Sequence, residues 1–315
     1  MKKTSIKNIF NENIKIKMVD NESDAAFITH SGTFHADEVM ATVILLNRFG
    51  NMKLFRCNNP TNNKAFIYDV GFGKFDHHGI DFDEKRENGI KYASCGLVWR
   101  CYGKDIIKRL EVSDVDSFFE SIDKNLIMDI DRDDNGQALT NEPEVRQQTI
   151  PGLIGCFNPS WNEKQDENES FLNAVNFANT IFNNMIKKML AKEDARKIVE
   201  KKIDESEDGI LILDCYMPWK DIVLSSNNPK ANDILYAIFP SKRGGYNVVA
   251  TPTSINSFDV KKPFLKSWAG KENKELQDIS GVKTITFCHK NLFICACNTF
   301  EDALKIAKIS INNTK

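Results

Sequence analysis

The sequence predicts an α/β protein, with a mostly parallel sheet flanked by helices in an N-terminal domain and a smaller C-terminal α+β domain. Three observations predict this fold class. A strand, a helix and two further strands follow one another within residues 25–70, a long amphipathic helix covers residues 170–205, and several short strands come after it. Strands that alternate with helices are typical of parallel sheets, whereas strands joined by hairpins are typical of antiparallel sheets.

The N-terminal pattern begins with a short apolar run, Ala25–Thr29. Val39–Phe49 then carries apolar residues at helical spacing, and Lys53–Arg56 and Ala65–Val70 are rich in strand-forming residues. A strand–helix–strand unit of this length gives parallel strands, and ligand sites in open parallel sheets lie at the carboxyl ends of the strands. We therefore expect a ligand site directly after the first and the last of these strands.

Four of the five histidines lie in two short stretches near these strand ends, at residues 30–38 and 69–79. Each of the four has a carboxylate within a few positions, and imidazole with carboxylate is a ligand set that divalent metals use. Two such stretches suggest two metal ions rather than one. The candidate ligands are His30, His35, Asp37, Asp69, Asp76, His77, His78, Asp131 and Asp134.

The next helix is expected to begin at Ser94, a good N-cap residue, and to stop at Gly103. Residues Thr149–Asn162 contain Pro151-Gly152 and Asn158-Pro159-Ser160-Trp161 and are expected to form an ordered loop. Ser170–Glu205 has a continuous apolar stripe at helical spacing and is expected to be a long amphipathic helix.

A helix is also expected from Ser113 to the acidic segment that ends near residue 134. In that helix Asp131 and Asp134 would share one face, because residues three apart are neighbours on a helix surface. A strand over Met128–Asp133 would instead place every second aspartate on one face. We favour the helix over the strand.

The C-terminal part shows five strand-like runs: Ile210–Asp214, Ile234–Phe239, Tyr246–Thr251, Thr284–Cys288 and Leu292–Cys297. Gly244-Gly245 and Lys290-Asn291 are typical of hairpin turns, and Thr299 is expected to cap a final helix. The expected organisation is a flexible N-terminal segment at 1–23, a catalytic domain with a long C-terminal linker helix at 24–205, and a substrate-binding domain at 206–315.

Composition excludes several classes of protein. Lys+Arg number 42 and Asp+Glu 44, which gives a net charge of −2 and no general nucleic-acid-binding charge excess. The net charge does not exclude a local basic groove, because it says nothing about how the charges are distributed. No apolar run approaches the roughly 20 residues of a membrane span, so no membrane partner is expected. The eight scattered cysteines include no Cys-x-x-Cys pair, which argues against a structural zinc site and for free thiols in a reducing, intracellular compartment.

Several motifs resemble those of known phosphoesterases. Asp76-His-His78, with Asp69 before it and a His-plus-Asp loop after the first strand, resembles the DHH phosphoesterase superfamily. One branch, the melanocyte proliferating gene 1 family, is similar over residues 24 to the C-terminus. The shared motifs are Thr29-His-Ser-Gly-Thr-Phe-His-Ala-Asp-Glu38, Asp69-Val-Gly71, Asp76-His-His78, Asp131 through Asp134-Asn-Gly136, Asn158-Pro-Ser-Trp161, Pro218-Trp-Lys220 and Ser280-Gly281.

The resemblance implies a role for each residue. One metal ion would take His30, His35 and Asp69, and the other would take Asp37, the bridging Asp69, His77 and Asp131. The superfamily motif is His-x-x-x-Asp-x-Asp, one residue shorter than His30-x-x-x-x-His35-x-Asp37. Because His35 stands in place of an Asp, the metal ion that His35 binds would have one negatively charged ligand fewer. The catalytic pair would be Asp76, which orients His77, and His78, which contacts the phosphate. Asp134 is the less favoured alternative to Asp131 as a ligand. Glu38 would either contact a ligand from behind or serve as a negative charge at the helix start.

The substrate-binding candidates lie in the second domain. His289, the fifth histidine, closes a strand, and an ordinary turn residue is an equally good interpretation of it. Lys261 and Lys262 stand where relatives of this branch tend to carry Arg, and lysine meets a phosphate as a point charge rather than as a fork.

The resemblance implies a metal-dependent 3′–5′ exonuclease that acts on single-stranded RNA by a two-metal mechanism, in the nucleus, mitochondrion or cytoplasm. Two ions of Mn²⁺ or Mg²⁺ are expected, because carboxylates match or outnumber imidazoles and no thiolate is placed to help. A small-molecule phosphohydrolase acting on pyrophosphate, a dinucleotide or a short oligonucleotide is the first alternative. A metal-binding regulatory protein without catalysis is the second.

Overall fold

The computed structural model describes residues 15–137, 148–164, 166–255 and 257–313. The chain divides into two compact units, Met1–Met189 and Leu190–Lys315. The boundary falls inside the helix α6 (Glu167–Asp204), whose last part therefore belongs to the second unit. The two units divide after Met189, whereas the sequence predicts a boundary at residue 205. The reason is that the end of α6 packs its apolar side chains into the core of the second unit.

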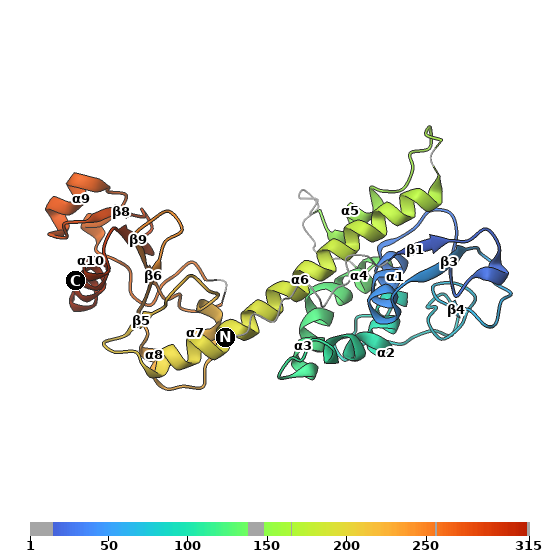
Figure 1. Ribbon diagram of the computed structural model, residues 1–315, viewed down its shortest axis with the longest axis horizontal. Helices are drawn as coiled ribbons and strands as arrows, with labels where there is room; N and C mark the ends of the chain where they lie inside the picture. The colour runs from blue at the N-terminus through green and yellow to red at the C-terminus, as the bar shows by residue number, and fades with distance from the viewer. Residues whose placement is uncertain (1–14, 138–147, 165, 256, 314–315) are drawn as a thin grey trace. The chain divides into compact units, whose positions relative to one another are not determined.

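The first unit contains a four-stranded parallel sheet with the order β1-β3-β2-β4 (Figure 1). Its strands are β1 (Ile16–Met18), β2 (Phe27–Thr29), β3 (Met52–Arg56) and β4 (Phe66–Ile67). Every pairing is parallel, which confirms the prediction for residues 25–70. The strand β1 lies in the segment expected to be flexible, and pairing of Ile16 with Met52 corrects that expectation for residues 15–18. Residues 1–14 lie outside the described residues.

The central helix α1 (Ala36–Phe49) is buried along almost its whole length and starts three residues earlier than predicted. It contacts α2 (Ser94–Lys108), which runs past Gly103 rather than ending there. Gly103 is buried within α2, and a Cβ at this position would lie 2.6 Å from the Trp99 ring. This glycine therefore makes room for the indole of its own helix instead of stopping it.

The acidic segment is helical, which confirms the favoured interpretation. It consists of α3 (Val115–Ile122), one stretch of π-helix, η3 (Asp123–Ile127), and α4 (Met128–Asp134). The expected loop at residues 149–162 contains instead a short helix, α5 (Ile150–Gly155). Thr149 explains this helix, because its side chain accepts a hydrogen bond from the Gly152 amide and a proline stands in the first turn.

The second unit contains a mixed five-stranded sheet with the order β5-β6-β7-β9-β8. Its strands are β5 (Ile210–Ile212), β6 (Tyr236–Pro240), β7 (Tyr246–Ala250), β8 (Ile285–Cys288) and β9 (Ile294–Cys297). All five expected strands and both hairpins are present. The pair β5–β6 is parallel, so the sheet is not wholly antiparallel as predicted. The parallel pair follows from the helices that connect these two strands.

The remaining helices are short, apart from α10. They are η2 (Glu22–Asp24) in the first unit and α7 (Lys220–Ser225), α8 (Lys230–Asp233), η4 (Lys266–Trp268), α9 (Asn273–Ser280) and α10 (Phe300–Asn312) in the second. The cap of α10 is Thr299, as predicted, because its side chain accepts a hydrogen bond from the Asp302 amide. Within the described ranges, no helix is long and apolar enough to cross a membrane.

The close packing of α2 against α4 leads to a first prediction. A Cβ at Gly96 would lie 1.8 Å from the Asp131 carboxylate and 2.8 Å from the Tyr92 ring. We expect Gly96→Ala to lower the free energy of unfolding by about 1–3 kcal/mol, since overpacking forces both neighbours to move. Urea denaturation measures the change. The control is Gly155→Ala, where nothing lies within 4 Å and a helical alanine should change stability by less than about 1 kcal/mol. Equal effects of the two substitutions would contradict the prediction.

Candidate metal centre

The polar cluster of the first unit lies where the sequence places it, directly after β2 and β4. His30 follows the last residue of β2, and Asp69 comes two residues after β4. Both line a pocket of about 590 Å³. The other pocket residues are Thr33, His35, Asn58, Asn59, Pro60, Thr61, Val70, Gly71, Phe72, Asp76 and His78.

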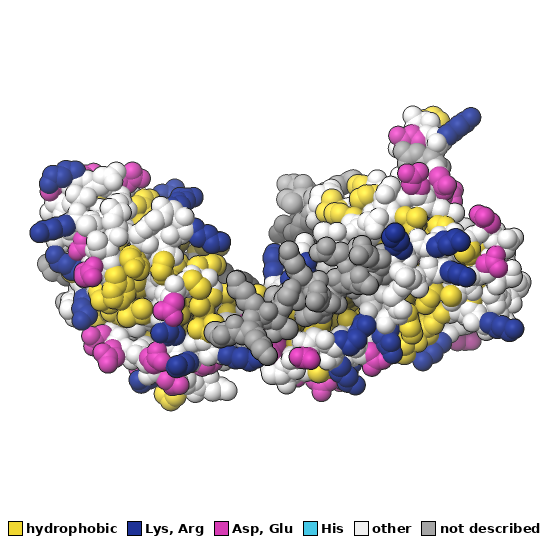
Figure 2. Space-filling model, viewed as in Figure 1, with side chains coloured by type: hydrophobic (Ala, Val, Ile, Leu, Met, Phe, Trp, Pro, Cys, Tyr) yellow, Lys and Arg dark blue, Asp and Glu magenta, His cyan; other side chains and the backbone are white. Residues whose placement is uncertain are grey.

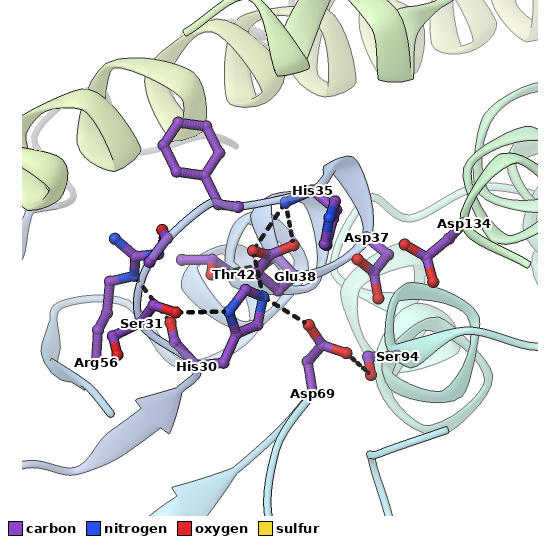
Figure 3. A network of polar contacts seen from close by, with 12 residues as sticks. His30, Ser31, His35, Asp37, Glu38, Thr42, Arg56, Asp69, Ser94 and Asp134 are labelled. Atoms are coloured by element: carbon purple, nitrogen blue, oxygen red, sulfur yellow. Dashed lines mark hydrogen bonds and ion pairs between the residues drawn. The ribbon is translucent and has the colours of Figure 1, made fainter. Parts of the chain in front are cut away.

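His30 joins two buried carboxylates. Its Nε2 lies 2.7 Å from Oε1 of Glu38 and 3.2 Å from Oδ2 of Asp69, and its Nδ1 lies 3.2 Å from the carbonyl oxygen of Ser31 (Figure 3). Burial would lower the pKa of His30, but the bonds to Asp69 and Glu38 outweigh burial and raise the pKa to about 10. Without a metal ion the imidazole therefore carries a proton, and that proton partly neutralises two acids.

The first turn of α1 presents an imidazole and two carboxylates. The His35 backbone amide donates to the carboxylate of Glu38 at 2.9 Å, which forms one half of a capping box. Asp37 is 1% exposed, and neither of its carboxylate oxygens has a hydrogen-bond partner among the described residues. Burial and the charges of Asp69, Asp134 and Glu38 raise the pKa of Asp37 well above its usual value. Such an unpaired buried carboxylate is unfavourable unless a cation satisfies it.

Asp69 occupies the centre of the cluster. It is 2% exposed and has a φ of 57°, in the left-handed region that non-glycine residues rarely adopt. Its Oδ1 accepts a hydrogen bond from the Ser94 hydroxyl at 2.9 Å and lies 3.5 Å from Nδ1 of His77, while its other oxygen faces His30. This carboxylate therefore stands between the two histidine stretches.

The second stretch holds two histidines in different ways. Nδ1 of His78 donates to Oδ1 of Asp76 at 2.7 Å, and the His78 side chain is 53% exposed. That hydrogen bond raises the pKa of His78. Burial would raise the pKa of Asp76, but the hydrogen bonds from His78 and Phe72 outweigh burial and hold it below its usual value. Asp76 therefore orients His78, whereas the sequence assigned it to His77.

The partner of His77 is Asp134. Nε2 of His77 lies 2.8 Å from Oδ2 of Asp134, and its Nδ1 is 3.3 Å from the Ser94 hydroxyl. Asp134 also lies next to Asp37 in Figure 3. The Asp134 pKa is held below its usual value, because the bond to His77 outweighs the effect of burial.

Asp131, which sequence reasoning favoured as the metal ligand, has partners outside the polar cluster. Its Oδ1 accepts a hydrogen bond from the Gly96 amide at 2.8 Å, and its Oδ2 lies 2.7 Å from Nη2 of Arg86. Arg86 also forms a two-pronged pair with Asp123 and packs over the Tyr92 ring. Burial raises the pKa of Asp131 to about 7 in spite of this arginine. The structure thus brings Asp134 into the cluster and leaves Asp131 as a buried partner of Arg86.

Among the described residues, four overlapping groups of side chains have atoms close enough to share a metal ion. They are Asp69 with Asp76, His77 and His78; His30 with His35 and Glu38; His35 with Asp37 and Asp134; and Asp37 with Glu38 and Asp69. Oxygen and imidazole donors of this kind suit Mn²⁺, Mg²⁺ or Zn²⁺. The unpaired Asp37 oxygens are the observation that fits a cation best.

Two residues that sequence reasoning missed hold the loop between His30 and His35. Arg56 donates from Nε to the carbonyl oxygen of His30 at 3.0 Å and from Nη2 to that of Gly32 at 2.8 Å. The Asn158 side chain accepts from the Phe34 amide at 3.0 Å and donates to its carbonyl oxygen at 2.8 Å. Asn158 lies in one of the quoted motifs, which was the available signal. Arg56 gave none, because a strand-end arginine is normally an exposed residue.

The three substrate-binding candidates of the second unit have local partners. Nδ1 of His289 accepts a hydrogen bond from the Asn291 amide at 3.0 Å in the turn between β8 and β9. The Lys261 ammonium donates to the carbonyl oxygen of Asn232 at the end of α8. The Lys262 ammonium donates to the carbonyl oxygens of Ile311 and Asn313 at the end of α10. These bonds give each residue a structural role, and substrate binding by them stays a prediction.

Charged side chains are mixed on the visible surface. Among the described residues on the face shown in Figure 2, basic and acidic side chains are interspersed on both units. No broad area of one sign appears among them on that face.

Taken together, the parallel sheet and the His–Asp cluster at its carboxyl edge define an α/β protein with a metal-binding type of site. The chain belongs to the MYG1 family, since the MYG1 exonuclease family model, described as an uncharacterised protein family (UPF0160), matches residues 26–311. The resemblance stated from the sequence is thereby confirmed.

Relatives from distant organisms match along nearly the whole chain. A MYG1 protein of Dictyostelium discoideum is 33% identical over 93% of this chain and 98% of its own. A MYG1 protein of Saccharomyces cerevisiae is 28% identical, over 95% and 99%. The MYG1 exonuclease of Mus musculus is 27% identical, over 90% of this chain and 84% of its own. No solved structure matches the chain.

The raised pKa of His30 predicts proton release on metal binding. A ligating imidazole must be neutral, so at pH 8 the proton that His30 carries must leave. We expect chelator-stripped protein to release about one proton more per molecule than a His30→Asn variant when Mn²⁺ is added. Titration calorimetry in two buffers of different ionisation enthalpy measures this number. Equal proton release from both proteins would show that His30 is not a ligand.

The different partners of the two aspartates predict opposite phenotypes. Asp134→Asn should lower Mn²⁺ affinity at least about tenfold, with stability in chelator changed by less than about 1 kcal/mol. Asp131→Asn should lower the free energy of unfolding by roughly 1–3 kcal/mol, since Arg86 keeps Asp123 as a second partner, and should keep its metal affinity. Chelator competition and urea denaturation measure the two quantities. The reverse pattern would return the ligand role to Asp131.

Proposed function

We propose that this protein is a metal-dependent phosphodiester hydrolase of the DHH type, acting as a 3′–5′ exonuclease on single-stranded RNA. The observation that carries the proposal is the buried Asp37, which has no hydrogen-bond partner among the described residues and lies in metal-type clusters with His35, Asp69 and Asp134. The mammalian relatives named MYG1 exonuclease support the class of reaction. RNA and the direction rest on the family resemblance.

Six side chains are proposed to hold two divalent ions. One ion would take His30, His35 and Asp69, and the other would take Asp37, Asp69, His77 and Asp134. Asp134 takes the place that sequence reasoning gave to Asp131, because Asp134 contacts His77. Mn²⁺ or Mg²⁺ remains the proposed metal, since carboxylates match the imidazoles in number and no cysteine is a member of these groups.

Bound divalent ions supply a Lewis acid and lower the pKa of a water molecule. The residues of the chain do the rest. Asp76 accepts from Nδ1 of His78, so Nε2 of His78 is the nitrogen left to face the pocket. The bond to Asp76 raises the pKa of His78, which favours the protonated imidazole, and in that form Nε2 can donate a hydrogen bond to a phosphate oxygen. Ser94 and Arg56 keep Asp69 and the His30 loop in place.

A small-molecule phosphohydrolase is the second candidate. The observation in its favour is the pocket itself, whose volume of about 590 Å³ is within the range of sites for single small ligands. The net charge of −2 also agrees with a short substrate, because long polyanions are usually met by an excess of basic residues.

One assay separates these candidates. Chelator-stripped protein receives Mn²⁺, Mg²⁺ or Zn²⁺ with a 5′-labelled single-stranded RNA, a dinucleotide or pyrophosphate. We expect a descending RNA ladder that needs metal and is at least about 100-fold weaker in His77→Ala, since that variant loses a ligand and the partner of Asp134. The control is His289→Ala, which alters a turn histidine and should leave the ladder intact.

Each alternative result has a meaning. Turnover of the dinucleotide or pyrophosphate without an RNA ladder would favour the small-substrate enzyme and keep the site. Hydrolysis that persists in chelator, or that His77→Ala does not change, would remove the proposed metal centre. A loss of the ladder in His289→Ala would support the substrate role that the sequence suggested for this residue.

A further inference from the structure

The loop between Asp69 and Asp76 has an unusual backbone. Asp69, Gly71 and Phe72 have φ values of 57°, 83° and 56°, so two of the three left-handed residues carry a side chain. Glycine adopts this region freely, whereas a bulky residue does so only at a cost in free energy. Strain of this kind is concentrated at functional sites when the surrounding structure enforces it. The left-handed backbone of Asp69 positions a carboxylate at the centre of the polar cluster. The left-handed backbone of Phe72 needs a separate explanation.

The backbone of Phe72 has a clear task. Its amide donates to Oδ2 of Asp76 at 2.6 Å, and Asp76 in turn holds His78. Glycine at position 72 would perform this task with less strain, because the hydrogen bond comes from the main chain. The ring must therefore be explained separately. It gains little from packing, since Phe72 is 77% exposed.

Phe72 is one of the residues that line the pocket. Phe72 lines it together with Pro60, Asn58 and Asn59, while His30, Asp69 and His78 line it from the polar cluster. The loop approaches Pro60 closely, since a Cβ at Gly71 would lie 3.0 Å from Cγ of that proline. Pro60 is half-buried and the two asparagines are exposed. The residues that line the pocket thus include the imidazoles and carboxylate of the polar cluster, an aromatic residue and two residues with side-chain amides.

We propose that Phe72 stacks on a nucleobase of the nucleotide whose phosphate lies at His30, Asp69 and His78. An exposed aromatic ring beside a phosphate site is what base stacking requires, and side-chain amides such as those of Asn58 and Asn59 suit the polar edge of a base. The substrate class is therefore a nucleotide that carries its base, and pyrophosphate is disfavoured. This inference rests on the proposed function, because it places a phosphate at the cluster.

The test compares two ligands that differ only in the base. Adenosine 5′-monophosphate and ribose 5-phosphate are titrated calorimetrically into Mn²⁺-supplemented protein. We expect the wild type to bind the nucleotide roughly 5- to 150-fold more tightly, which is the range of one base–aromatic contact. In Phe72→Gly this ratio should fall below about 2, with unchanged binding of ribose 5-phosphate and a Tm that is not lowered. Phe72→Tyr should keep the preference.

The control for loss of an exposed apolar side chain is Ile80→Ala. Ile80 is 99% exposed, and it is absent from the residues that line the pocket. Its variant should keep the wild-type ratio.

Three results would overturn the inference. One is a wild type that binds the two ligands equally or binds neither, and another is a Phe72→Gly variant that keeps the preference. The third is an equal loss of both ligands in Phe72→Gly, which would mean that position 72 acts through Asp76 and His78. Failure of the proposed function is seen separately, as the absence of metal-dependent hydrolysis in the wild type.

Discussion

The burial of several carboxylates within one small region is the constraint on which the first unit depends. Asp37, Glu38, Asp69 and Asp131 are each at most 2% exposed. A buried carboxylate is costly unless a hydrogen bond or a cation compensates it. Glu38 and Asp69 have His30, and Asp131 has Arg86. Asp37 has no hydrogen-bond partner among the described residues and only a long contact of 3.9 Å with Nδ1 of His77, and burial raises the pKa of its carboxyl group. A divalent cation would compensate this burial.

The fold explains why these groups meet. Parallel strands bring residues that follow β2 and β4 to one edge of the sheet, although about forty positions separate them in the sequence. The start of α1 adds a third set, and the positive end of the helix macrodipole favours acids there. Arg56 and Asn158 then fix the intervening loop through its backbone. The polar cluster is therefore held by ordinary elements of an α/β sheet.

Much of this site could be predicted, for a physical reason. His30 and Asp69 follow strands, and strand ends are visible as the points where apolar alternation stops. The choice between Asp131 and Asp134 could not be made in that way. Both lie on α4, after the π-helical stretch η3, and a π-helix changes the angular position of all residues that follow it. A period of 3.6 residues consequently fails to say which of the two faces the cluster.

Lys261 and Lys262 show how little charge alone says about a binding role. A lysine in the domain expected to bind substrate has the charge for a phosphate, and local sequence does not reveal a nearer partner. The structure supplies carbonyl oxygens at the ends of α8 and α10, and these bonds stabilise helix C-termini. Phe72 presents the converse case, since its strained backbone carries a side chain that is 77% exposed. Charge alone is thus weak evidence for a binding role, whereas an uncompensated structural cost beside a polar pocket is stronger evidence.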